Sequence, residues 1–296
     1  MGLLQGISAP QLTPFHEDGS VNFEEYERLS DYLAEAGLQG IFVCGTTGEF
    51  VNLTIEEREL LLLAAVKGSK GRSRIMFNVT AMNLRDIRLL SEFARDHGAD
   101  CLSLTPPYYH HYDDAAMEEY FVKAANAAAD MPVYLYNMPG MTHNPLTPNV
   151  LNKVCARCEN VVGIKDSSMD HMTFLDFQLA KPREDFELIT GNDAQVLTAL
   201  MAGGVGGVIA LAGVYPKLCQ KIYDDFMAGD MTGAKEAQDK IHKLRAMVRR
   251  VMPIMAHKEM LKMQGFNMGP ARFPFRELTQ GEKKEIHDCV ESLGLM

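Results

Sequence analysis

The feature that most constrains the fold of this sequence is a regular alternation of short apolar runs with helical segments. Such alternation is typical of parallel strands joined by crossover helices. Runs such as GIFV, VYLY and VVGI are almost continuously apolar, as expected for parallel strands covered on both faces. Eight such runs precede helical stretches, at residues 6–12, 40–45, 74–79, 101–105, 132–137, 161–165, 186–190 and 206–211.

Helix-start and helix-stop residues lie where this alternation requires them. Asn22 and Glu25 have capping-box spacing at the start of a predicted helix. Gly37 is suited to the left-handed backbone conformation that ends this helix. Thr54 and Glu57 repeat the capping-box spacing at the start of the next predicted helix. These residues predict helices that begin soon after each strand ends.

Eight strand–helix units in succession predict an α/β fold, a (β/α)8 TIM barrel at residues 1–229. A doubly wound open sheet is the alternative, but no glycine-rich nucleotide loop follows the first strand. Residues 230–296 have the pattern of three helices, and no Pro/Gly/Ser-rich linker divides them from the barrel. We therefore expect a C-terminal three-helix appendage that packs on the barrel.

Composition and charge exclude several classes of function. Hydrophobic residues make up 47% and charged residues 23%, as in soluble globular proteins. The net charge of −10 argues against a nucleic-acid partner, which requires a basic patch. The sequence has neither an apolar run long enough to span a bilayer nor a visible signal peptide. We expect a cytoplasmic protein without a membrane partner.

Cysteine and histidine spacing does not predict a metal site. Cys155 and Cys158 form a single C-x-x-C in a predicted helix, without the second pair that a zinc ribbon requires. His110, His111 and His143 lie near predicted strand ends but lack the spacing of metal ligands. Contact with a substrate is the alternative role for these histidines.

Reactive side chains gather at the predicted carboxyl ends of the strands, where barrels of this type hold their active sites. Lys165 ends the run VVGIK, so its amine is expected at the mouth of the barrel. Burial lowers the pKa of a lysine, and the neutral amine can attack a ketone to form an imine. A structural ion pair of Lys165 with a carboxylate such as Asp166 is the alternative.

Tyr136 and two threonines are expected near this lysine. Tyr136 ends the preceding strand, so its phenol can approach Lys165 and transfer protons to and from a substrate oxygen. Thr46 and Thr47 lie in a glycine-flanked turn, where backbone N–H groups and hydroxyls can hold a small carboxylate. The structural alternatives are that Tyr136 is an ordinary aromatic residue of the barrel interior, and that the glycines of the turn are needed only for its backbone conformation.

Three motifs at these positions resemble the dihydrodipicolinate synthase/N-acetylneuraminate lyase family. They are GTTGE at residues 45–49, YNxP at 136–139 and GIKD at 163–166, and the resemblance extends over nearly the whole chain. It implies a pyruvate Schiff base on Lys165 and a proton-relaying phenol at Tyr136. It also implies a homotetramer, a dimer of dimers, that acts on pyruvate and an aldehyde without a metal or organic cofactor.

The resemblance assigns roles to further residues. Thr46 is expected to hydrogen-bond the catalytic phenol, and Thr47 to hold the carboxylate of pyruvate. Tyr109 resembles the family tyrosine that reaches into the active site of the neighbouring subunit. The expected substrate-binding residues are Thr47, Gly45, Ser167, Gly191, Asp193, Ile209 and Met141.

Departures from the family pattern bear on the substrate. Dihydrodipicolinate synthases carry a substrate-binding arginine where this chain has Met141, and methionine lacks the bidentate fork that binds a carboxylate. Sialic acid lyases have an apolar residue at that position. Of their polyol-binding residues, Asp193 matches, whereas Ala194 and Ala210 replace an acid and a serine.

The sequence therefore predicts a class I aldolase or lyase for a 2-keto-3-deoxy sugar acid or a related 2-oxo acid. The alternatives are a dihydrodipicolinate synthase in which another cation replaces the arginine, an N-acetylneuraminate lyase, and a catalytically idle homologue that binds a keto acid. The basic stretch KLRAMVRR at residues 243–250 is predicted to be a solvated helix face.

Overall fold

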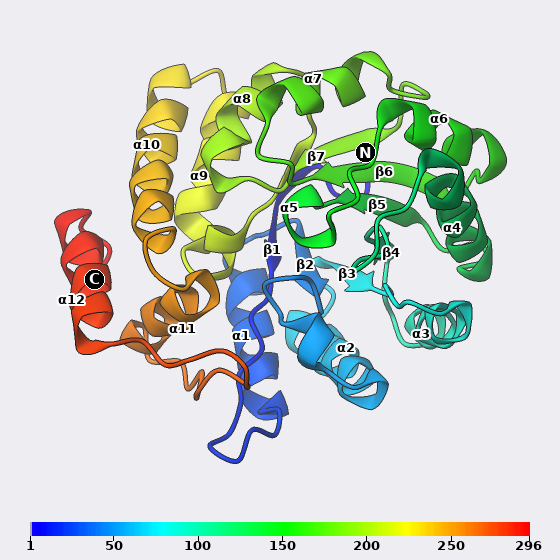
Figure 1. Ribbon diagram of the computed structural model, residues 1–296. Helices are drawn as coiled ribbons and strands as arrows, with labels where there is room; N and C mark the ends of the chain where they lie inside the picture. Colours follow the sequence, from blue (N-terminus) through cyan, green and yellow to red (C-terminus); the bar gives the residue numbers. More distant parts are fainter. Residues whose placement is uncertain (1) are drawn as a thin grey trace.

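A computed structural model describes residues 2–296, and its strands form one closed parallel barrel (Figure 1). Each strand pairs with its neighbours in sequence, and β1 also pairs with β8 to close the barrel. The predicted TIM barrel is confirmed and the open sheet is wrong. The strands are β1 (Gly6–Pro10), β2 (Gly40–Val43), β3 (Arg74–Asn78), β4 (Cys101–Leu104), β5 (Val133–Asn137), β6 (Val161–Asp166), β7 (Glu187–Thr190) and β8 (Gly206–Val208).

Helices follow the strands and surround the barrel (Figure 1). The longer ones are α1 (Phe23–Glu35), α2 (Ile55–Ser69), α3 (Leu84–Asp96), α4 (Asp114–Ala127), α6 (Pro148–Arg157), α7 (His171–Leu179), α8 (Val196–Met201) and α9 (Pro216–Met227). Short helical turns follow four strand ends: η1 (Phe50–Asn52), α5 (Pro139–Thr142), η2 (Asp193–Gln195) and η3 (Ala210–Gly213). These turns present side chains at the mouth of the barrel.

The predicted helix caps are largely confirmed. Asn22 accepts a hydrogen bond from the N–H of Glu25 before α1, and Thr54 and Glu57 form a reciprocal capping box before α2. The reciprocal half of the first box is absent, because the Glu25 carboxylate instead bonds Arg28 at 2.6 Å. Gly37 follows α1 with a φ of 82°, as the left-handed position requires.

Three helices form the C-terminal region: α10 (Met231–Val248), α11 (Pro253–Met263) and α12 (Gln280–Ser292). This agrees with the three helices expected at residues 230–296. α10 packs along α9, and α11 contacts η3, which follows β8 (Figure 1). The region therefore borders the carboxyl ends of the strands. None of the helices in residues 2–296 is both long and apolar enough to cross a membrane.

Two apolar cores hold the barrel together. A large core fills the layer between the strands and the helices, and a smaller core fills the barrel interior. At the amino end of the barrel, the Glu187 carboxylate accepts hydrogen bonds from the Tyr134 hydroxyl at 2.6 Å and from the Leu4 N–H at 3.0 Å. These bonds close the amino end. The interior core consists of Leu4, Phe42, Met76, Cys101, Tyr134, Tyr136, Ile189 and Val208.

Candidate active site

Lys165 lies at the carboxyl end of β6 with its side chain inside the barrel. The residue is only 3% exposed, and its Nζ lies 4.0 Å from the centroid of the Tyr136 ring and 4.8 Å from that of Phe42. The adjacent Asp166 accepts hydrogen bonds from Asn137 and from the Ser168 hydroxyl, each at 2.8 Å. Among residues 2–296, no carboxylate oxygen lies within 4.0 Å of Lys165 Nζ, so the alternative ion pair of Lys165 with Asp166 is wrong.

The surroundings of Lys165 favour a reactive amine. Burial lowers the pKa of Lys165, and this effect outweighs the opposing influence of the Tyr136 phenol and Asp193. A larger fraction of the amine is thus neutral and nucleophilic than for an exposed lysine. Burial opposes ionisation of Tyr136, but Lys165 and Thr46 together bring the pKa of this phenol below its ordinary value.

Strand register brings the phenol and the amine together. Tyr136 on β5 is the direct register partner of Lys165 on β6. The Tyr136 hydroxyl lies 3.5 Å from Thr46 Oγ1, so the hydroxyl pair expected from the sequence is present. Phe42 packs edge-on against Tyr136 with the ring centroids 6.0 Å apart. Phe42 was not predicted, because an aromatic residue in a buried strand has no distinguishing pattern.

The GTTGE turn after β2 is shaped by close contacts. A Cβ atom at Gly45 would lie 2.7 Å from the Phe42 ring, so only glycine fits there. The Thr13 hydroxyl donates to the Gly48 carbonyl at 2.7 Å and joins this turn to the end of β1. In this turn, Thr46 and Thr47 line the open pocket above Lys165.

A buried ion pair holds the end of the same turn. Glu49 has a left-handed backbone with φ of 61°, and its carboxylate lies 2.8 Å from Lys258 Nζ on α11. Both side chains are fully buried, and burial raises the pKa of Glu49 and lowers that of Lys258. The pair connects the turn to the C-terminal region. Sequence spacing does not predict it, because its members are far apart in the chain.

Gly191 and Ser167 form the surface directly above Lys165. A Cβ atom at Gly191 would lie 1.8 Å from Ser167 Oγ and 2.8 Å from Lys165 Cε, so a side chain there would displace the reactive lysine. The buried Ser167 Oγ lies close enough to the Tyr136 hydroxyl to help lower its pKa, but within residues 2–296 it makes no hydrogen bond of 3.5 Å or shorter. It is therefore available for a substrate hydroxyl, as expected from the sequence.

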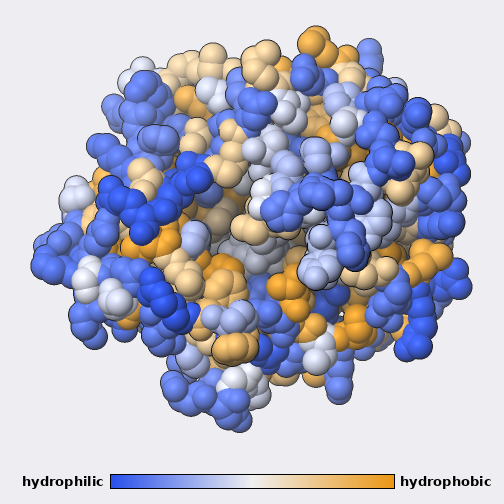
Figure 2. All heavy atoms as spheres, in the orientation of Figure 1, coloured by the Kyte–Doolittle hydropathy of each residue, from blue (hydrophilic) through white to orange (hydrophobic). Residues whose placement is uncertain are grey.

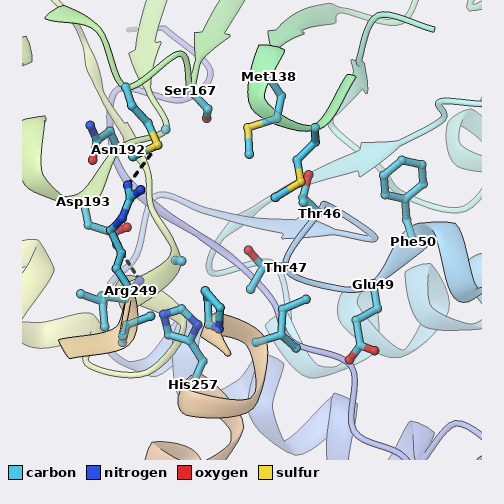
Figure 3. A pocket seen from close by; sticks show the side chains of 18 of the residues that line it. Thr46, Thr47, Glu49, Phe50, Met138, Ser167, Asn192, Asp193, Arg249 and His257 are labelled. Atoms are coloured by element: carbon cyan, nitrogen blue, oxygen red, sulfur yellow. Dashed lines mark hydrogen bonds between the residues drawn. The ribbon is translucent and has the colours of Figure 1, made fainter. Parts of the chain in front are cut away.

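A pocket of about 570 Å³ opens above these residues, and Figure 2 shows the same face of the molecule hollowed near its centre. Figure 3 shows Asp193 and Arg249 on one side of the pocket, Phe50 and Glu49 on the other, and Thr47 between them. The lining includes most of the predicted substrate-binding residues: Thr47, Ser167, Gly191, Asp193 and Met141. Much of the remaining wall is apolar, from Phe50, Val51, Met138, Met169, Val248, Met252 and Ile254.

Two arginines at the end of α10 also line this pocket: Arg245 in its last turn and Arg249 at its C-cap. Arg245 is partly buried and Arg249 is exposed, and both belong to the KLRAMVRR stretch. The prediction of a solvated face holds for the exposed Arg249 but not for the partly buried Arg245, because one side of α10 faces the mouth of the barrel. His257 of α11 is buried beside them, and burial lowers its pKa. Local sequence patterns do not identify Arg245, Arg249 and His257 as pocket residues, because they lie far along the chain from Lys165.

Several predicted residues lie elsewhere. Tyr109 is 86% exposed and outside the pocket of its own chain, whereas Tyr108 lines the pocket and packs edge-on against Phe50. The Ile209 side chain is fully buried at the end of β8 and does not line the pocket. The Asp193 carboxylate accepts a hydrogen bond from the Leu211 N–H at 2.7 Å, so one of its oxygens is already engaged.

The predicted histidines and cysteines lie outside the pocket as well. The ring of His111 hydrogen-bonds the carbonyl of His143 at 3.1 Å, and His110 packs against Tyr109. Cys155 and Cys158 are free cysteines at the end of α6. Within residues 2–296, three or more potential metal ligands do not come together at any point.

Comparisons with known proteins agree with this geometry. The sequence model of the dihydrodipicolinate synthetase family matches residues 3–293. A 4-hydroxy-tetrahydrodipicolinate synthase of Methanoculleus marisnigri is 32% identical over 296 residues, which cover 99% of this chain and 100% of that protein. An uncharacterized DapA-like lyase of Pyrococcus horikoshii is 33% identical over 244 residues, 81% of this chain and 83% of the other.

Solved structures give the same result. YagE, a prophage protein of the dihydrodipicolinic acid synthase family from E. coli K12, was solved in complex with pyruvate. It aligns with a TM-score of 0.95 and 26% identity over 100% of both chains. Dihydrodipicolinate synthase from Cyanidioschyzon merolae, with lysine bound, aligns with a TM-score of 0.94 at 26% identity over 100% of both chains. The chain thus belongs to the dihydrodipicolinate synthetase family, which includes the dihydrodipicolinate synthases and N-acetylneuraminate lyases.

Proposed function

We propose that this protein is a pyruvate-dependent lyase that forms a Schiff base through Lys165. Its substrate is a 2-keto-3-deoxy sugar acid or a related 2-oxo acid. The observation that carries the proposal is the buried Lys165 amine, 4.0 Å from the centroid of the Tyr136 ring. It lies beneath Gly191 and Ser167, which line an open pocket. The complex of YagE with pyruvate is consistent with the same ligand here.

In the proposed reaction, the neutral Lys165 amine attacks the ketone carbon of the 2-oxo acid. The carbinolamine then loses water to give a protonated imine, which accepts the electron pair of the breaking C3–C4 bond. The C4 hydroxyl loses its proton, so an aldehyde and an enamine of pyruvate are formed. Protonation at C3 and hydrolysis of the imine release pyruvate and restore the amine. The imine itself accepts the electrons, so this chemistry requires no metal or organic cofactor.

The residues around Lys165 have matching roles in this proposal. Tyr136 transfers protons to and from the carbinolamine and the C4 oxygen, and Thr46, 3.5 Å away, orients its hydroxyl. Thr47 holds the carboxylate of the pyruvate unit, and the unpaired hydroxyl of Ser167 binds a substrate hydroxyl. These intact groups disfavour the catalytically idle alternative.

Tyr109 is highly exposed and lies outside the pocket of its own chain. We propose that it completes the active site of a neighbouring subunit in a cytoplasmic homotetramer, a dimer of dimers. A Tyr109→Ala variant should then lose activity although its own pocket is unchanged.

Dihydrodipicolinate synthase is the second candidate, because a relative with that activity in its name is 32% identical over almost the entire chain. Met141 lines the pocket at the position of the synthase arginine, and a thioether cannot form a charged pair with a carboxylate. Arg245 and Arg249 are the cations that could replace it.

Two assays separate these candidates. In the first, 2-keto-3-deoxy acids are supplied and pyruvate release is followed with lactate dehydrogenase and NADH. In the second, pyruvate and aspartate semialdehyde are supplied and the cyclic condensation product is measured. Activity in the first assay that Lys165→Met abolishes supports the lyase. Activity confined to the second assay supports the synthase, and folded protein without activity in either assay contradicts both.

A further inference from the structure

The two α10 arginines give the pocket a positive end that the proposed lyase mechanism does not use. Arg245 lies in the last turn of α10 and Arg249 is its C-cap residue, with helical backbone angles, so the two side chains are one turn apart on the same side. Both line the pocket that contains Ser167 and Gly191, the residues directly above Lys165. Figure 3 shows Arg249 beside Asp193 on this side of the pocket.

Neither arginine is neutralised by the protein. Within residues 2–296, no carboxylate oxygen lies within 4.0 Å of either guanidinium, whereas the adjacent Arg250 pairs with Glu285 at 2.6 Å. Among the described residues, the side chain of Arg249 donates one hydrogen bond, to the sulfur of Met169 at 3.4 Å, and this sulfur is a weak acceptor. Like charges one turn apart repel each other, and the chain as a whole carries a net charge of −10. An unpaired arginine pair in such a protein is suited to an anionic ligand.

Asp193 is the carboxylate that acts on Arg245, but it forms no ion pair with it within 4.0 Å. Burial, reinforced by Arg249, lowers the pKa of Arg245 despite the opposing effect of Asp193. One carboxylate oxygen of Asp193 already accepts the Leu211 N–H at 2.7 Å. His257 of α11 is buried and also lines the pocket.

We infer that Arg245 and Arg249 bind a second anionic group, a carboxylate or a phosphate, at the end of the substrate distant from the Schiff base. The inference rests on the proposed function, because the first anionic group is the carboxylate of the pyruvate unit. Methionines 138, 141, 169 and 252 line the pocket with flexible side chains that adapt to chains of different shape. In this proposal, Arg245 and Arg249 of the C-terminal region supply the positive charge that the synthases have in place of Met141.

Binding of small anions to the trapped enzyme tests this site. Reduction with borohydride in the presence of pyruvate fills the pyruvate position with a stable adduct on Lys165. Inorganic phosphate and propionate are then titrated by calorimetry at low ionic strength. We expect one of them to bind, and Arg245→Gln/Arg249→Gln to weaken its binding roughly 10- to 150-fold, as for charge-assisted hydrogen bonds. Arg250→Gln, a control on the same helix end, should bind as the unaltered enzyme does.

Turnover of matched aldehydes identifies the anion. Pyruvate is combined with glyceraldehyde 3-phosphate and glyceraldehyde, and with succinic semialdehyde and butanal. We expect kcat/KM to favour the anionic member of one pair, and the double variant to lose this preference while it retains the neutral reaction. A preference for glyceraldehyde 3-phosphate over glyceraldehyde assigns a phosphate. A preference for succinic semialdehyde over butanal assigns a carboxylate.

The outcomes separate the two proposals. If phosphate and propionate bind the unaltered enzyme no more tightly than the double variant, the arginine site is overturned. If no adduct forms on Lys165, the proposed lyase fails, and the same titration on untrapped protein still decides whether the arginines bind an anion.

Discussion

Tyr136 and Lys165 are register partners on neighbouring strands, and the lysine Nζ lies 4.0 Å from the centroid of the tyrosine ring. Both side chains are buried, so each strongly affects the protonation of the other. The proposed chemistry depends on this relationship, because the amine must be neutral for attack and the phenol must carry the proton that attack displaces.

Imine formation should have an unusually low pH midpoint for a lysine. Burial lowers the pKa of Lys165 below the ordinary 10.5, and only the neutral amine attacks the ketone. The rate of adduct formation should therefore rise with pH through a midpoint below 10.5 and level off above it. Trapping rates with cyanoborohydride measure this, with Nα-acetyl-lysine as the reference for the pH dependence of the reduction. A midpoint equal to that of the reference would contradict the account.

Loss of the Tyr136 hydroxyl should slow turnover by about 10²- to 10⁴-fold, the usual contribution of general acid–base catalysis. Tyr136→Phe keeps the ring that packs against Phe42, so the fold should be retained. Thr46→Val should have a smaller effect, because Thr46 acts only through the Tyr136 hydroxyl, 3.5 Å away. In the double variant, the Thr46 substitution should add almost nothing. Additive losses in kcat would show that Thr46 acts independently of the phenol.

Gly191→Ala should inactivate the enzyme without unfolding it. The added Cβ would lie 2.8 Å from Lys165 Cε and still closer to Ser167 Oγ, so the lysine must move away from its present position. Gly140→Ala is the matched control, because nothing lies within 4 Å of its added Cβ. Circular dichroism and the yield of trapped adduct report the two effects. Normal adduct formation in Gly191→Ala would contradict the described packing.

Lys258→Met should destabilise the protein by about 3–5 kcal/mol, the usual effect of leaving one member of a buried ion pair alone. Glu49 would then be a buried carboxylate without its partner at 2.8 Å. Because burial raises the pKa of Glu49 above its unfolded value, the folded state takes up a proton more readily, so the deficit should shrink as pH falls. Urea unfolding at several pH values measures this, and a pH-independent deficit would count against it.

The sequence predicted the barrel and its reactive floor because local patterns determine both. Apolar runs specify the strands, and capping residues such as Thr54 specify where helices begin. A residue that ends a strand then lies at the mouth of the barrel. Lys165 and Tyr136 could be predicted on this basis. The packing of both side chains against Phe42 could not be predicted, because it depends on how side chains fill the barrel interior.

The far side of the pocket could not be predicted for a different physical reason. Arg245 and His257 reach the pocket only because α10 packs on α9 and α11 contacts η3, contacts between segments distant in sequence. Basic residues on an amphipathic helix have the same pattern whether they face solvent or a cavity. The prediction of a solvated face failed for Arg245 for this reason.

The most direct test of the central claim is covalent trapping. The protein is incubated with pyruvate, reduced with borohydride, digested and analysed by mass spectrometry, with Lys165→Ala as the control. The account predicts a reduced pyruvyl adduct on the peptide that contains Lys165 and none in the variant. Folded protein without an adduct, or an adduct on another lysine at equal yield, would contradict the assignment of Lys165 as the Schiff-base residue.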